Sequence, residues 1–107
     1  MKTHRILSAV LLLALLMPAL QLANAAAQSF TGVISDSMCA KKHMMAGKTD
    51  AQCTEDCVKE GASYVLVSGD KVYTLSAKKG LIAPFAGKKV QVQGNLQGTS
   101  IIVTAIK

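Results

Sequence analysis

The residues of this sequence that could do chemistry are three cysteines and a histidine close together in the chain. Cys39 and His43 are four residues apart, and Cys53 and Cys57 repeat that spacing. Side chains four residues apart lie on one face of a helix, so a helix over the second pair would present two sulfurs together. Three thiolates and an imidazole form a known tetrahedral zinc site. The pattern predicts a metal site made of Cys39, His43, Cys53 and Cys57.

The identity of such a metal stays open between zinc and copper(I). Thiolate and thioether sulfur both suit copper(I). Three methionines accompany the cluster, namely Met38, Met44 and Met45. Zinc would make no use of these thioethers.

A disulfide is the alternative use of the same cysteines. A bond from Cys39 to Cys53 or Cys57 would close a loop of roughly 15 to 19 residues and stabilise the fold by about 3 kcal/mol in the chain-entropy model. The third thiol would then stay free or pair with another molecule. A thiol redox enzyme is the least favoured interpretation, because the sequence has no C-x-x-C motif. Asp36 is expected to be a turn residue at a strand end rather than a ligand.

The first 25 residues have the features of a secretory signal peptide. Lys2 and Arg5 precede an apolar run over residues 6–16, and Ala23-Asn24-Ala25 forms an A-x-A cleavage site. That run is shorter than the roughly 18 apolar residues of a membrane-spanning helix. We expect residues 26–107 to form the mature domain, periplasmic or secreted, with no stable membrane anchor after cleavage.

Length and charge limit the remaining classes of function. The chain of 107 residues has room for one domain, and its 12 Lys and Arg outnumber its 6 Asp and Glu. The lysines come in scattered pairs, and only 4% of the residues are aromatic, so a nucleic-acid partner is not expected. A metal ion or a small ligand is the expected partner.

The pattern of β-branched residues and turns predicts a mainly β fold. Five strands are expected at residues 30–36, 64–67, 72–75, 90–96 and 101–106. A short helix is expected from Thr49 or Asp50 to Glu60, and at most one helical turn around residues 81–86. Gly32 and Gly94 interrupt their strands, as glycines do where a small sheet coils strongly. Residues 37–61 therefore form an insertion between the first two strands.

The strand series resembles that of small exported bacterial proteins with the oligonucleotide/oligosaccharide-binding (OB) fold. The elements Phe30-x-Gly32-x-Ile34, Val90-x-Val92-x-Gly94 and Ile101-x-Val103 contribute to this resemblance. The segment Gly32-x-Ile34-x-Asp36-x-x-Cys39 with Cys53-x-x-x-Cys57-Val58 is similar to a family of small secreted bacterial domains of uncharacterised function. The resemblance implies a five-stranded OB-like barrel with a Cys-containing loop-helix insertion, and no particular activity.

Two functions follow as expectations. The first is an exported binding or structural domain, not an enzyme, whose three cysteines and one histidine hold zinc or copper(I). The second is a disulfide-stapled OB-like module that binds a small ligand, peptide or glycan on the open barrel face and holds no metal.

Overall fold

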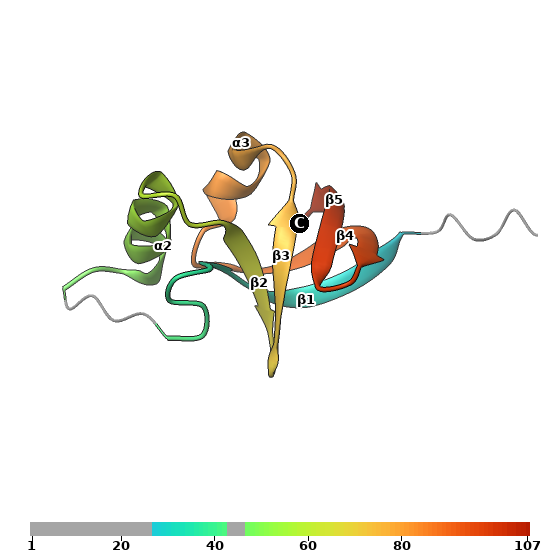
Figure 1. Cartoon of the computed structure of the whole chain (residues 1–107), viewed down its shortest axis with the longest axis horizontal. Helices are drawn as coiled ribbons and strands as arrows, with labels where there is room; N and C mark the ends of the chain where they lie inside the picture. Colours follow the sequence, from blue (N-terminus) through green and yellow to red (C-terminus); the bar gives the residue numbers. More distant parts are fainter. Residues whose placement is uncertain (1–26, 43–46) are drawn as a thin grey trace, which may run out of the picture.

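The computed structural model describes residues 27–42 and 47–107, which form a small β-barrel. The strands close in the order β1-β2-β3-β5-β4, and Figure 1 shows them curving around one another. Their bounds are β1 Gln28–Asp36, β2 Tyr64–Ser68, β3 Lys71–Ser76, β4 Lys89–Gln97 and β5 Ser100–Ile106. The predicted mainly β fold, an OB-like five-stranded barrel, is confirmed. The predicted signal peptide, residues 1–25, lies outside the described residues.

Two tight hairpins and one parallel contact determine this closure. β2 and β3 turn at Gly69, and β4 and β5 turn at Gly98, both with positive φ. β3 pairs with β5 in parallel, and β1 pairs with both β2 and β4. Each strand therefore has two neighbours, so the closed sheet has no free edge.

The two strand glycines stand where the backbone of a neighbouring strand comes close. A Cβ on Gly32 would overlap the carbonyl oxygen of Val67, and one on Gly94 would overlap that of Ile102. The β4–β5 register also shifts between Gln93 and Gly94, which marks a bulge. Both glycines thus allow a close backbone approach, with a bulge at Gly94, and their role at corners of the barrel stays a prediction.

The barrel interior is a compact apolar core. Its fully buried side chains include Ile34, Leu66, Val92 and Ile101, each from a different strand. Two short turns, α3 (Lys79–Ile82) and η2 (Ala83–Phe85), contribute Ile82 to it. The sequence predicts at most one turn here and places its start two residues later. The chain can form the second turn because Pro84 lies in the first turn of η2, where its missing N–H is not needed.

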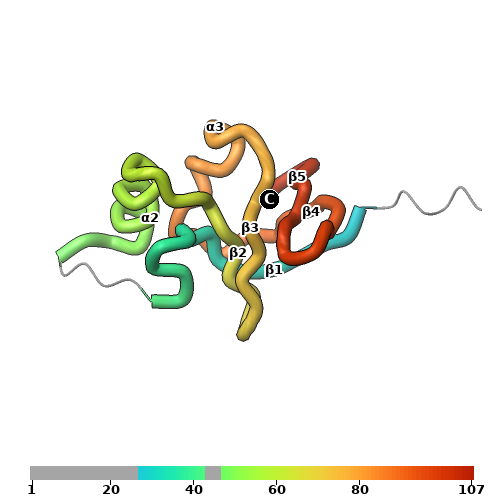
Figure 2. The backbone as a smooth tube through the Cα atoms, in the orientation of Figure 1, coloured from blue at the N-terminus to red at the C-terminus, as the bar shows by residue number. Residues whose placement is uncertain are grey.

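The insertion forms the helix α2 (Asp50–Lys59) on one side of the barrel. In Figures 1 and 2 this helix lies beside the segment that follows β1 and away from α3. It packs against β1, and its buried residues are Cys53, Thr54, Cys57 and Val58. The predicted helix between the first two strands is confirmed.

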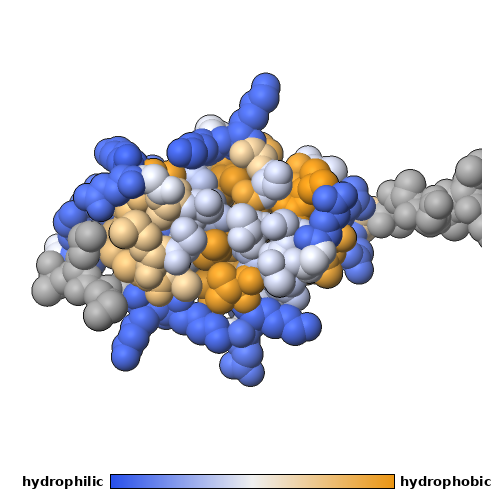
Figure 3. Space-filling view, in the orientation of Figure 1, coloured by the Kyte–Doolittle hydropathy of each residue, from blue (hydrophilic) through white to orange (hydrophobic). Residues whose placement is uncertain are grey.

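All of the described lysines are exposed. On the face seen in Figure 3, hydrophilic side chains lie at several places around the outline, with apolar patches between them. Within the described residues, no helix combines the length and apolar character needed to cross a membrane.

Candidate metal centre

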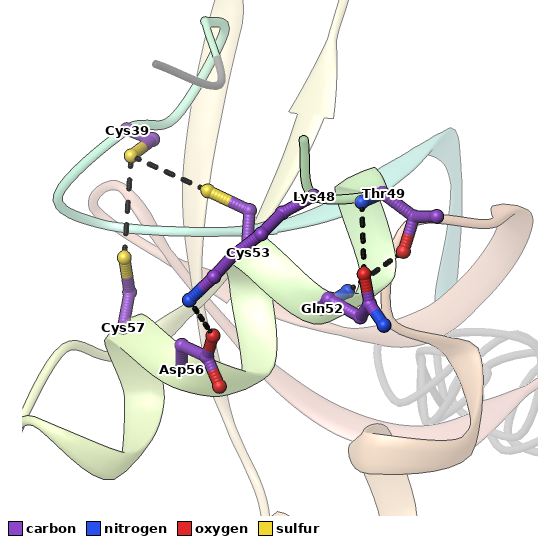
Figure 4. Close-up of polar contacts among 7 residues, drawn as sticks. All are labelled: Cys39, Lys48, Thr49, Gln52, Cys53, Asp56 and Cys57. Atoms are coloured by element: carbon purple, nitrogen blue, oxygen red, sulfur yellow. Dashed lines mark hydrogen bonds and ion pairs between the residues drawn. The ribbon is translucent and has the colours of Figure 1, made fainter. Parts of the chain in front are cut away.

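Three cysteine sulfurs meet between α2 and the turn that follows β1. Cys39 Sγ lies 4.0 Å from Cys53 Sγ and 4.0 Å from Cys57 Sγ, and the three sulfurs all lie within 4.8 Å of one another. Figure 4 shows Cys39 facing the two helical cysteines from the opposite side. Cys53 and Cys57 are buried, whereas Cys39 is partly exposed. The group is closed on the helix side and accessible from the turn.

The turn that carries Cys39 is organised by Asp36, the last residue of β1. Its carboxylate Oδ1 accepts hydrogen bonds from the backbone N–H of Met38 and of Cys39, both at 2.9 Å. The Asp36 carbonyl oxygen accepts a further bond from the Ala40 N–H at 2.7 Å. An Asp side chain bonded to the backbone two and three residues later is a recurrent turn geometry. Asp36 thus fixes the direction in which Cys39 leaves the strand.

The same turn holds a strained residue. Ala40 has a φ of 47°, in the left-handed region that non-glycine residues seldom occupy. Ser35 Oγ donates a 2.6 Å hydrogen bond to the Ala40 carbonyl oxygen, and this bond restrains the turn from its other side. These hydrogen bonds hold Ala40 in its strained conformation, and the turn that results places Cys39 next to α2.

Hydrogen bonds also join the two ends of the insertion. The Ser37 N–H donates to the Ser63 carbonyl oxygen at 2.9 Å, and the Ser63 N–H donates to Ser37 Oγ at 3.0 Å. Ser63 follows α2 and precedes β2. The start of the Cys39 turn is therefore tied to the far end of the segment that carries the other two cysteines.

α2 is fixed at its N-terminus and along one side. Thr49 and Gln52 form a capping box, each side chain accepting a hydrogen bond from the backbone N–H of the other (Figure 4). Lys48 forms an ion pair with Asp56. Tyr64 donates a 2.6 Å hydrogen bond to Glu55, so the helix is also anchored to β2. The two helical cysteines therefore sit on a well-supported element.

Burial controls the protonation of the Cys57 thiol. It raises the pKa of Cys57 to about 12, with smaller contributions from the hydrogen bond to Cys39 and from the negative charge of Asp36. Without a metal, this thiol is neutral at pH 7. A metal ion must displace its proton in order to bind.

The sulfur spacing fits a metal ion. Thiolates on a tetrahedral zinc at about 2.3 Å stand about 3.8 Å from one another, close to the 4.0 Å separations from Cys39. A disulfide needs about 2.05 Å, and no described cysteine pair is at that distance. The three residues thus form a group that could hold a metal.

The sequence predicted part of this arrangement. Cys39, Cys53 and Cys57 are brought together as expected, whereas His43, like Met44 and Met45, lies outside the described residues. Met38 is 62% exposed.

Sequence reasoning missed the burial of Asp36. It was expected only as a turn residue, which the structure confirms, but its side chain is fully buried. The available signal was its position three residues before Cys39, a spacing at which a carboxylate can hold the backbone N–H of the cysteine.

A hollow of about 210 Å³ lies over the outer face of β1 and β2, beside the turn that carries Cys39. It is lined by Val33, Ser35, Ala40, Lys41, Asp50 and Val67. Ligand pockets commonly measure about 300 to 1,000 Å³. This hollow is smaller, so the thiol group is the better-supported site.

No protein-family model matches the chain, and comparisons with curated proteins and with solved structures also found no match. The chemistry of the site is therefore inferred from its own geometry.

Proposed function

We propose that this chain is an exported metal-binding domain in which Cys39, Cys53 and Cys57 hold zinc or copper(I). The observation that carries the proposal is the convergence of three sulfurs, with Cys39 Sγ 4.0 Å from each of the other two. His43, four residues after Cys39, is the proposed fourth ligand. The domain would act in the periplasm or outside the cell after removal of residues 1–25.

Placement and support of the thiols favour metal binding over simple packing. Two sulfurs come from one helix face and the third from a turn held by Asp36 and strained at Ala40. Cysteines that served only as buried packing residues would not require such a turn. Structural metal sites are built in this way, with ligands from separate elements that the ion then locks together.

The second candidate is the disulfide-stapled module that binds a small ligand, peptide or glycan. The favouring observation is that Cys39 is equally close to two partners, so a modest movement would allow a bond to either. In an oxidising compartment, thiols that a metal does not occupy tend to form this bond.

Intact mass of the purified protein under native, non-reducing conditions separates the two candidates. Metal binding predicts an increment of one zinc or copper ion that disappears in both Cys53→Ser and Cys57→Ser. The control Leu96→Ser, which alters an exposed side chain of β4, should keep the increment. A mass lower by two hydrogens, with no metal even after reduction and reloading, would overturn the proposal in favour of the disulfide. The same spectrum reports whether residues 1–25 have been removed.

A further inference from the structure

The most unusual polar group beside the thiols is the carboxylate of Asp36. Its side chain is fully buried, with 0% of its surface exposed. Oδ1 accepts two backbone hydrogen bonds, but Oδ2 has no hydrogen-bond partner among the described residues. A buried carboxylate is costly unless a cation or hydrogen-bond donors compensate its charge. Here only one of the two oxygens is compensated.

The carboxylate lies beside the metal-binding group without being part of it. Asp36 bonds directly to the backbone of Cys39, and its negative charge acts on the thiol of Cys57. Among the residues that the structure describes, the side chains whose ligand atoms converge are the three cysteines. Asp36 can therefore influence a bound ion through its charge and through the position of Cys39, not as a ligand.

We propose that Asp36 is a positioning residue that sets the charge selectivity of this site, favouring a divalent ion over a monovalent one. The inference rests on the proposed function, because it assumes an ion between the three sulfurs. Attraction between two charges scales with their product, so a carboxylate at a given distance attracts Zn²⁺ twice as strongly as Cu⁺. Solvent screens this difference little, because Asp36 is buried.

The test compares the full chain with Asp36→Asn, which keeps an acceptor oxygen for the N–H groups of Met38 and Cys39 but removes the charge. Affinities for Zn²⁺ and for Cu⁺ are measured by competition with chromophoric chelators, in reduced protein without oxygen. Loss of a group behind the metal ligands commonly weakens binding about 10- to 100-fold, and we expect that loss for Zn²⁺. Cu⁺ carries half the charge of Zn²⁺, so its binding free energy should change by half as much, which is about a 3- to 10-fold loss of affinity. The Zn²⁺/Cu⁺ affinity ratio should therefore fall about 3- to 10-fold.

Asp70→Asn is the matched control, since it removes the same charge from an exposed hairpin turn. The ratio should not change in this variant. Metal-driven refolding provides a second readout if Asp36→Asn does not fold alone, because the concentrations of Zn²⁺ and Cu⁺ that restore the fold report the same ratio.

Each outcome has a distinct meaning. An equal loss of affinity for both ions, or no loss, overturns the inference and leaves the proposed function standing. Failure of both ions to refold the variant also overturns it, since Asp36 would then serve the fold alone. If the unmodified chain binds neither ion, the proposed function falls and the inference falls with it.

Discussion

At the scale of single residues, the three cysteines differ in their access to solvent. Cys39 is partly exposed on a turn, whereas Cys53 and Cys57 are buried against the barrel. Burial raises the pKa of Cys57 to about 12. The site therefore has one accessible thiol and two buried ones, and of the buried pair Cys57 becomes a thiolate at neutral pH only when a cation compensates its charge.

This difference predicts the order in which the metal-free, reduced protein is alkylated. Iodoacetamide reacts with thiolates, so at pH 8 Cys39 should be modified first and Cys57 far more slowly. Peptide mapping by mass spectrometry gives the order, and equal rates at Cys39 and Cys57 would contradict it.

The raised pKa of Cys57 also makes folding stability depend on pH. The folded protein keeps the Cys57 proton until about pH 12, above the ordinary value of 9.0. The contribution of this thiol to the free energy of unfolding is therefore fully present below pH 9 and declines as the pH rises toward 12.

Ala40 provides a second residue-scale prediction. Its positive φ of 47° costs about 1 to 2 kcal/mol for a residue with a Cβ. Glycine avoids this cost, but it loses more backbone entropy on folding, which offsets roughly half of the gain. Ala40→Gly should therefore raise the free energy of unfolding by about 0.5 to 1 kcal/mol. Urea denaturation measures the change. The same substitution at Ala51, exposed in the first turn of α2, should lower stability by less than the roughly 1 kcal/mol that glycine costs in a helix interior, and a loss at both positions would contradict the argument.

At the scale of secondary-structure elements, the sequence predicts what depends on local pattern. The strands, the hairpins at Gly69 and Gly98 and the helix after Thr49 follow from β-branched runs, turn residues and a cap. The placement of Cys53 and Cys57 on one face follows from helical spacing.

Closure of the site depends on contacts between distant parts of the chain. Cys39 reaches α2 because Asp36 holds its turn and because Ser37 bonds to Ser63 beyond the helix. The spacing of the cysteines could suggest this meeting but not establish it. The burial of Asp36 also depends on how α2 covers the end of β1, which no local pattern specifies.

Gly87 gives the element-scale prediction, because it lies against the first turn of α2. It has a φ of 76°, and a Cβ there would stand 2.7 Å from the Ala51 backbone nitrogen. Gly87→Ala should strain the backbone, displace the start of α2 and weaken metal binding about 10-fold or more, as supporting residues of metal sites do. Gly98→Ala is the matched control, since its φ of 62° is strained but a Cβ there meets open space. Calorimetric titration should show weakened binding only in Gly87→Ala, and equal affinities would refute the coupling.

At the scale of the whole molecule, the barrel and the insertion perform different tasks. The barrel has its own core of side chains from all five strands. The insertion adds a small separate cluster of Cys53, Cys57 and Ala62, with Cys39 packed against it. So few apolar groups contribute little burial energy. An ion that joins the turn to α2 would supply the stabilisation that this cluster lacks.

Metal binding should therefore raise the thermal stability of the entire domain. An ion at a free concentration 100 times its Kd, bound only by the folded state, adds about 2.7 kcal/mol. Each kcal/mol shifts the Tm of a domain this size by about 4 to 8 °C, which gives a rise of about 10 to 20 °C with Zn²⁺ or Cu⁺. Scanning calorimetry of the reduced protein measures it. Mg²⁺ prefers oxygen ligands and should leave the Tm unchanged, as should Zn²⁺ added to the Cys53→Ser, Cys57→Ser double variant. A rise of similar size with Mg²⁺, or in that variant, would mean that the stabilising ion binds away from the sulfurs.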